Sequence, residues 1–185
     1  PLRLDLEKGR SAHDLRQRFT LSYIYKLPFQ FQQRWAQLIL GGWENSGIVT
    51  LQTGFPFSLL VGGDIPNIGA AGTNTRANVV GDWRPANQTI DTWFNPAAFA
   101  QPPSYTFGNT GRNILDGPGT RAFDMTLNKA FRVTERQSFQ LRFEFFNALN
   151  HPNYGLPNAT VGSPAIGTIR SADNREMQVG LKYLF

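Results

Sequence analysis

The sequence predicts an all-β fold, an antiparallel up-and-down transmembrane β-barrel, of which the chain supplies a C-terminal fragment of about five strands with long external loops. Five segments alternate apolar and polar residues with period two, which is typical of strands with one apolar face. The 185-residue chain has 15 Phe, 5 Tyr and 4 Trp, whereas charged residues make up only 17%. No uninterrupted apolar run approaches the roughly 18 residues of a spanning helix, so any membrane crossing must be made by strands.

The first two predicted strands lie near residues 18–29 and 43–60. The apolar face of the first carries Phe19, Leu21, Tyr23, Tyr25 and Leu27, and Ile24 is an exception on the polar face. The apolar face of the second carries Trp43, Val49, Leu51, Phe55, Phe57 and Leu59. Both segments reach the roughly 11 residues that a strand tilted near 45° needs to cross an apolar band about 25 Å tall.

The other three predicted strands lie near residues 122–133, 138–149 and 173–185. Their polar faces carry the charged side chains that we expect to line a hydrated lumen, namely Asp124, Arg132, Arg142, Glu144 and Lys182. Carboxylates beside cations suit such a lumen better than paired acid–base catalysis, so we expect no enzyme. Lys129 interrupts the apolar face of the third strand, and we expect its ammonium to reach toward the periplasmic headgroups.

The connections between the predicted strands are unequal in length. A tight turn around Thr134 and Glu135 joins the third and fourth strands, whereas external loops are predicted near residues 61–120 and 150–172. Outer-membrane barrels have short periplasmic turns and long external loops, so the tight turn is assigned to the periplasm. The link from Gln30 to Gly42 must then also be periplasmic, although it is longer than the usual turn.

The loop near residues 61–120 is the best candidate for a ligand-facing element. It is rich in Gly, Asn and Pro but keeps several aromatic residues, so we expect it to fold over the barrel mouth. The candidate ligand-facing residues are Trp83, Trp93, Phe94, Asn95 and Tyr105. Exposed rings beside Asn could stack on a sugar or hold an apolar ligand, and packing of the loop against itself is the commoner alternative.

Composition excludes several classes of site. The chain has no Cys, which removes disulfides and thiolate sites, and its 2 His lack an accompanying carboxylate cluster, so no metal or cofactor is expected. The net charge of +5 comes from singly scattered Lys and Arg without a basic stripe, which argues against a nucleic-acid partner. The chain begins at Pro1, and we expect it to be part of a longer protein.

The C-terminal tail resembles the terminal signature of outer-membrane barrels. Val179, Leu181, Tyr183 and Phe185 alternate with polar residues, and the series closes on an aromatic residue. Such a signature implies recognition by the barrel-assembly machinery. A soluble β-sandwich could also bury this alternating face against a second sheet, but the strand lengths and the terminal Phe argue against that fold.

Longer segments resemble TonB-dependent receptors, especially the Oar-like group with a carboxypeptidase-regulatory-like N-terminal domain. The resemblance is carried by the run from Phe107 to Gly155, most specifically by "EFFNALNHPN", and by "DLRQRFTLSYIYKLPF" and "LGGWENSGIVTLQTGFPFSL". It implies a barrel of roughly 22 strands in the bacterial cell outer membrane, closed by a plug and energised by the TonB complex. Import of an unknown scarce solute is then the leading hypothesis, and a surface structural or adhesion role without transport is the alternative.

Overall fold

The computed structural model describes residues 8–69 and 75–185, in which the chain forms two compact units. We call Gln17–Gln52, Thr120–Asn153 and Asp173–Phe185 the strand unit. We call Pro1–Arg16, Thr53–Gly119 and Tyr154–Ala172 the loop unit.

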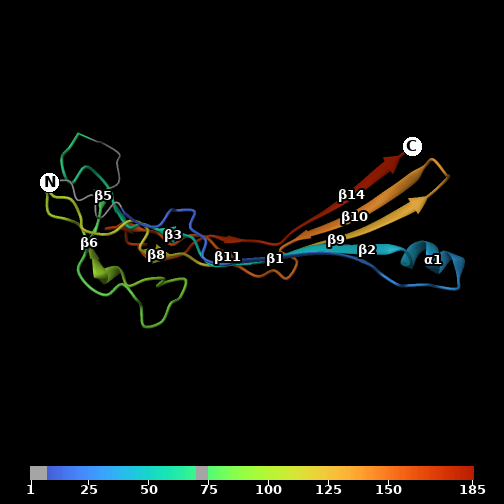
Figure 1. Ribbon diagram of the computed structural model, residues 1–185, viewed down its shortest axis with the longest axis horizontal. Helices are drawn as coiled ribbons and strands as arrows, with labels where there is room; N and C mark the ends of the chain where they lie inside the picture. The colour runs from blue at the N-terminus through green and yellow to red at the C-terminus, as the bar shows by residue number, and fades with distance from the viewer. Residues whose placement is uncertain (1–7, 70–74) are drawn as a thin grey trace. The chain divides into compact units, whose positions relative to one another are not determined.

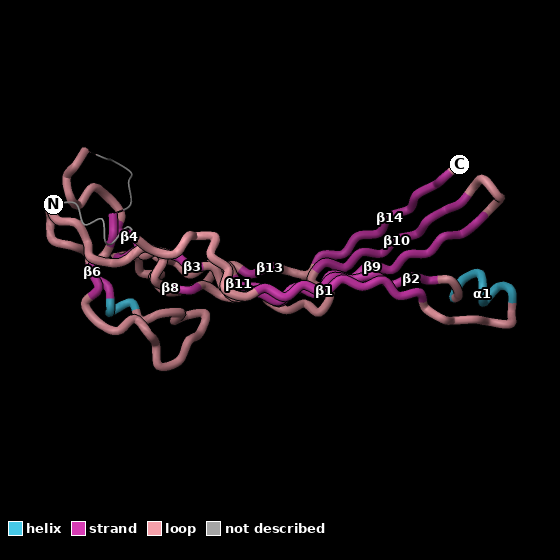
Figure 2. Tube along the Cα trace, viewed as in Figure 1, coloured by secondary structure: helices cyan, strands magenta, loops and turns pink. Residues whose placement is uncertain are grey.

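The strand unit is one five-stranded antiparallel sheet with the order β1-β2-β9-β10-β14 (Figures 1 and 2). Its strands are β1 (Arg18–Lys26), β2 (Trp43–Gln52), β9 (Thr120–Arg132), β10 (Ser138–Phe146) and β14 (Glu176–Leu184). Neighbouring strands in the sheet are also successive long strands in the chain, which confirms the antiparallel up-and-down topology. The strands have 9 to 13 residues, in keeping with the roughly 9 to 11 of a tilted transmembrane strand.

The register places every odd-numbered residue of the sheet on one face. Tyr25 lies opposite Asn45, Leu127 lies opposite Phe143, and Phe143 lies opposite Val179, and the other pairs also join residues of equal parity. We call this side the odd face, and it is the predicted apolar face. The opposite, even face is mostly polar, with Ile24, Ile48, Phe146 and Leu184 as its large apolar exceptions.

Four of the predicted strands end within four residues of their expected limits, but the second ends at Gln52 instead of residue 60. A Cβ at Gly54 would lie 1.7 Å from the carbonyl oxygen of Gly117, so the two chain segments meet there without room for a side chain. Beyond that point β3 (Pro56–Phe57) pairs with β8 (Leu115–Asp116). Phe57 and Leu59 are therefore buried in the loop unit, and their assignment to the apolar face of the second strand was wrong.

The link between β1 and β2 contains the helix α1 (Arg34–Leu40), which the sequence did not predict. Lys129 on β9 contacts the end of this helix. Its ammonium donates to the carbonyl oxygens of Ile39, at 3.0 Å, and of Gly41, at the end of α1. The side chain is buried, with 4% of its surface exposed.

The loop unit is built from short pairings around a hydrophobic core. The remaining elements are β4 (Leu60–Val61), β5 (Thr75–Arg76), β6 (Asn78–Val79), the 3-10 helix η2 (Pro96–Ala98), β7 (Phe99–Ala100), β11 (Asn153–Tyr154), β12 (Thr160–Val161) and β13 (Ala172–Asp173). β4 pairs with β5 and, in parallel, with β12, β6 pairs with β7, and β11 pairs with β13. The two predicted external loops are therefore folded together, because β12 comes from the second of them.

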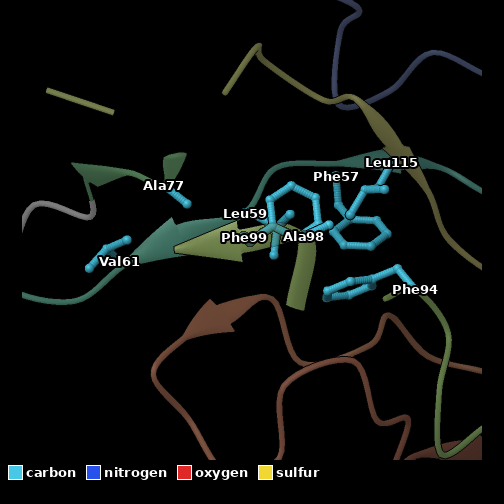
Figure 3. Packing of buried hydrophobic residues seen from close by; sticks show 8 residues of the cluster. All are labelled: Phe57, Leu59, Val61, Ala77, Phe94, Ala98, Phe99 and Leu115. Atoms are coloured by element: carbon cyan, nitrogen blue, oxygen red, sulfur yellow. The ribbon is translucent and has the colours of Figure 1, made fainter. Parts of the chain in front are cut away.

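The core of the loop unit consists of Phe57, Leu59, Val61, Ala77, Phe94, Ala98, Phe99 and Leu115 (Figure 3). Phe94 packs against Phe57 with ring centroids 6.1 Å apart, and edge-on against Phe99 at 5.8 Å. Ala159, Val161 and Ile166 add partly buried side chains from the second loop segment. Burying one such large side chain contributes about 1.5 to 3 kcal/mol, so this cluster holds the loop segments together.

We predict that residues 1–185 expressed alone do not form a soluble monomer. β1 and β14 are edge strands of the sheet, and the odd face exposes large apolar side chains. Unpaired edges and a wide apolar face both promote association in water. Size-exclusion chromatography in detergent-free buffer is expected to show aggregate, and a sharp monomeric peak would contradict the prediction.

Candidate functional site

The even face carries a hydrogen-bonded polar row across three strands of the sheet. Arg142 on β10 donates to the side-chain oxygen of Asn128 on β9 at 3.2 Å and forms an ion pair with Glu144 at 3.3 Å. Glu144 in turn accepts a hydrogen bond from the side chain of Gln178 on β14. Asn128 lies opposite Arg142, Gln178 lies opposite Glu144, and Arg142 and Glu144 are two residues apart on β10, so the sheet itself aligns the row. Such a row suits a hydrated surface.

All five predicted lumen-facing residues lie on this even face, but they have different surroundings. Asp124 accepts the backbone N–H of Asn147 at 2.9 Å and so holds the turn that follows β10. Arg132 and Lys182 are exposed near the opposite end of the sheet. Only Arg142 and Glu144 belong to the polar row.

The motif "EFFNALNHPN" forms the end of β10 and the turn after it. Asn147 and Asn150 have φ angles of +50° and +53°, in the left-handed region that Asn tolerates better than most residues. The Asn147 side chain also donates to the carbonyl of His151 at 2.8 Å and accepts its N–H at 3.0 Å. Asn153 accepts the backbone N–H of Arg121 at 2.7 Å. These asparagines bind backbone groups that the sheet leaves unpaired.

The loop unit contains an open cavity of about 760 Å³. The aromatic residues Trp83, Trp93 and Phe94 line this cavity. Among the residues that the structure describes, the charged ones in the lining are five cations and one carboxylate, namely Lys8, Arg10, Arg16, Arg84, Arg112 and Asp116. The described lining of the cavity therefore combines aromatic and basic residues.

The indole rings of the cavity are held in place by contacts within the loop unit. Trp93 donates its indole N–H to the carbonyl of Asp116 at 2.8 Å. Trp83 stacks on Phe99 with ring centroids 6.3 Å apart, and the Arg84 guanidinium lies 5.7 Å from the centre of its ring. The rings of Trp83 and Trp93 are thus oriented before any ligand arrives, which lowers the entropic cost of binding.

The predicted ligand-facing residues are only partly brought together. Trp83, Trp93 and Phe94 line the cavity, although Phe94 is only 1% exposed and belongs mainly to the core. Asn95 lies outside the cavity lining and caps η2 by accepting the N–H of Ala97 at 3.1 Å. Tyr105 is also outside the lining and is 75% exposed.

Sequence reasoning missed Asn113, which connects distant parts of the loop unit. Its carbonyl accepts two hydrogen bonds from the Arg10 guanidinium, at 3.0 and 3.2 Å, and its side-chain amide donates to the carbonyl of Arg10 at 2.7 Å. Ser58 bonds both to its amide oxygen and to its backbone N–H. Arg10 also forms a 2.6 Å ion pair with Asp116. No local pattern signals contacts across 103 residues.

In residues 8–69 and 75–185, no three His, Asp or Glu lie close enough together to hold a metal ion. Over the same ranges, no helix is both long and apolar enough to cross a membrane.

Comparison with known proteins assigns the family. A family model described as an outer membrane beta barrel domain matches residues 1–178. The chain belongs to this family. No curated protein and no solved structure matches the chain. The barrel domain is therefore located in the bacterial outer membrane, and its long antiparallel strands are those of an outer-membrane barrel.

Membership of the family explains why the odd face of the barrel domain is left uncovered. Leu21, Leu51, Met177, Val179 and Leu181 are all exposed in the strand unit. In a soluble sandwich these side chains would be buried against a second sheet. In an outer-membrane barrel they contact lipid, which makes the exposed odd face the expected arrangement.

The four residues of the predicted assembly signal lie on the odd face or directly after it. Val179, Leu181 and Tyr183 are exposed on the odd face of β14, and Phe185, just beyond the strand, is 93% exposed. Tyr183 packs against Phe139 with ring centroids 4.9 Å apart and against Phe185 at 5.7 Å. The three rings collect at the end of the sheet that carries the turn between β9 and β10.

We predict that Leu21→Arg destabilises the intact barrel more than Ser22→Arg. The two positions are adjacent on β1 but lie on the odd and even faces. A cation facing lipid near the bilayer midplane costs roughly 2 to 4 kcal/mol, whereas one facing the lumen stays hydrated. The measurement is denaturant unfolding of both variants of the full-length protein in phospholipid vesicles. Equal losses would show that the facing is misassigned.

We predict that deletion of Phe185 lowers the amount of full-length protein reaching the outer membrane without weakening molecules that have inserted. One terminal side chain contributes at most about 1.5 to 3 kcal/mol, a loss that a large barrel tolerates. Quantitative immunoblots of outer-membrane fractions measure abundance, and heat-modifiable gel mobility measures folding. Normal abundance with a reduced melting temperature would show instead that Phe185 acts through packing.

Proposed function

We propose that the intact protein is a TonB-dependent receptor that takes up a scarce solute and that the loop unit supplies a binding site for this solute. The cavity lined by Trp83 and Trp93 is the observation that carries the proposal. A loop unit with its own core and a preformed cavity is suited to solute capture. The resemblance of "EFFNALNHPN" to TonB-dependent receptors supports the same function.

The lining of the cavity favours an anionic solute with a flat face. Among the charged lining residues that the structure describes, Asp116 is paired with Arg10, and the other cations are Lys8, Arg16, Arg84 and Arg112. Arg84 also lies 3.8 Å from Asp82, but both side chains are largely exposed, so that pair is weak. Guanidinium groups bind carboxylates and phosphates, and an indole face stacks on a sugar or aromatic ring.

The odd face of the sheet contacts outer-membrane lipid, and the even face lines the hydrated interior of the barrel. The C-terminal strand is recognised by the barrel-assembly machinery, and the TonB complex acts through a region N-terminal to this chain. The protein is a receptor and not an enzyme, since its polar row is an ion-paired surface rather than a paired acid and base.

We predict that the full-length protein binds a uronic-acid oligosaccharide more tightly than a neutral oligosaccharide of equal length. The double variant Arg16→Ala/Arg112→Ala is expected to bind the acidic probe roughly tenfold more weakly, because two charge-assisted contacts are lost. Arg170→Ala is the matched control, since Arg170 is an exposed cation of the loop unit outside the cavity. Binding is measured by tryptophan fluorescence in detergent.

The same protein is then tested for binding of the periplasmic domain of TonB from its own organism. Binding of both the acidic probe and TonB supports import. Binding of neither supports the alternative, an Oar-like surface structural or adhesion protein. An acidic probe that binds wild type and the double variant equally would contradict the assignment of the cavity.

A further inference from the structure

The helix α1 has 7 residues and exposes an apolar face. Trp35, Leu38 and Ile39 occupy positions i, i+3 and i+4 and are 65%, 60% and 55% exposed. Residues at this spacing share one side of a helix. Ala36 is the buried residue of α1, so the large apolar side chains of this helix point away from the protein.

Side chains of the odd face hold the C-terminal end of α1 against the sheet. Lys129 donates to the carbonyls of Ile39 and Gly41, and the indole N–H of Trp43 donates to the same Ile39 carbonyl at 3.0 Å. The last carbonyls of a helix lack partners within the helix and carry negative partial charge, so an ammonium is stabilised there. The Lys129 ammonium also lies 5.5 and 5.0 Å from the ring centres of Trp43 and Phe131.

A second set of bonds fixes the segment that leads into α1. The Gln37 side chain accepts the backbone N–H of Phe31 at 2.7 Å, and the Gln37 carbonyl accepts the N–H of Gly41 at 3.1 Å. The helix is therefore held at both ends, by Gln37 from within and by Lys129 and Trp43 from the sheet. Its exposed apolar face is part of an ordered arrangement.

The surroundings of α1 match the boundary between lipid headgroups and acyl chains. Lys129 and Trp43 lie on the odd face, which contacts lipid in an outer-membrane barrel. Figure 1 shows α1 at the same end of the sheet as the β9–β10 turn and the C-terminus, where the rings of Tyr183 and Phe185 also collect. Aromatic side chains concentrate at this depth in membrane proteins.

The charge of the link also fits a phospholipid surface. Between Lys26 and Glu44 the sequence has no Asp or Glu, and Arg34 is its only charged residue. A cation beside an exposed Trp and two aliphatic side chains is the usual composition of helices that lie in a membrane interface. A carboxylate-free surface is not repelled by lipid phosphates.

We propose that α1 is an interfacial helix that binds the phospholipid headgroup–acyl boundary of the outer membrane, and that Lys129 docks it there through the carbonyls at its C-terminal end. The lipid contact of the wall thus continues beyond the strands onto the link between β1 and β2. Assignment of this contact to the periplasmic leaflet rests on the proposed orientation, whereas the lipid contact itself rests on family membership. Neither the lipid contact nor its leaflet depends on whether the protein takes up a solute.

The test uses full-length protein in phosphatidylethanolamine–phosphatidylglycerol vesicles, labelled at single cysteines with an environment-sensitive fluorophore. The chain has no Cys of its own, so Leu38→Cys places one label on the apolar face of α1. Glu135→Cys is the control, an exposed polar position in the tight turn at the same end of the sheet. Phospholipids brominated along their acyl chains quench labels in the membrane, and iodide quenches labels in water.

We expect brominated lipid to quench the label at position 38 several-fold more than the label at 135, and iodide to show the reverse order. Equal iodide quenching at both positions would overturn the proposal. A label at 38 shielded from both quenchers would also overturn it, since a protein would then cover α1. Because the readout contains no solute and no TonB, its outcome is independent of the uptake proposal.

The role of Lys129 is tested by Lys129→Met in the Leu38→Cys background. Met is of similar length and suits a lipid-facing position, so the barrel is expected to keep its heat-modifiable mobility. Loss of the ammonium should release the helix and reduce quenching by brominated lipid at position 38. Unchanged quenching would show that Lys129 does not dock α1.

Discussion

Pairing of backbone groups where water is absent is the constraint on which the strand unit depends. A strand in hydrocarbon must satisfy each N–H and C=O through its neighbours, so the register across the sheet is fixed along its whole length. In this sheet every pairing joins residues of equal parity, and Phe143, for example, lies between Leu127 and Val179. A slip of one residue in any strand would turn its apolar side chains into the interior. One face can meet lipid only because all four pairings agree.

The loop unit is stabilised differently, by burial of the apolar side chains of its segments against one another. Phe57, Phe94 and Phe99 gather residues that lie far apart in the sequence. Asn113 then binds Arg10 and Ser58 with both its backbone and its side chain. These contacts hold part of the cavity lining in place, since Arg10, Asn113 and Asp116 line it. The core and the cavity lining therefore share residues, among them Phe94 and Leu115.

Lys129 shows how a charge is accommodated on the apolar odd face of the sheet. A bare ammonium on the odd face would lose its hydration, which is costly in hydrocarbon. The carbonyls of Ile39 and Gly41 replace that water, and the rings of Trp43 and Phe131 cover the group. The same contacts hold α1, so the charge and the helix stabilise each other.

The sequence alone determined the all-β class, the five long strands, the even-face position of residues such as Arg142, and the tight turn at Thr134 and Glu135. These features follow from period-two alternation and turn chemistry, which are local properties of the chain. Only the tertiary structure decided that β2 ends at Gln52, that Phe94 is largely buried, that Asn113 binds Arg10, and that Lys129 donates to the C-terminal end of α1. Each of these depends on contacts between residues distant in sequence, for which alternation along the chain carries no signal.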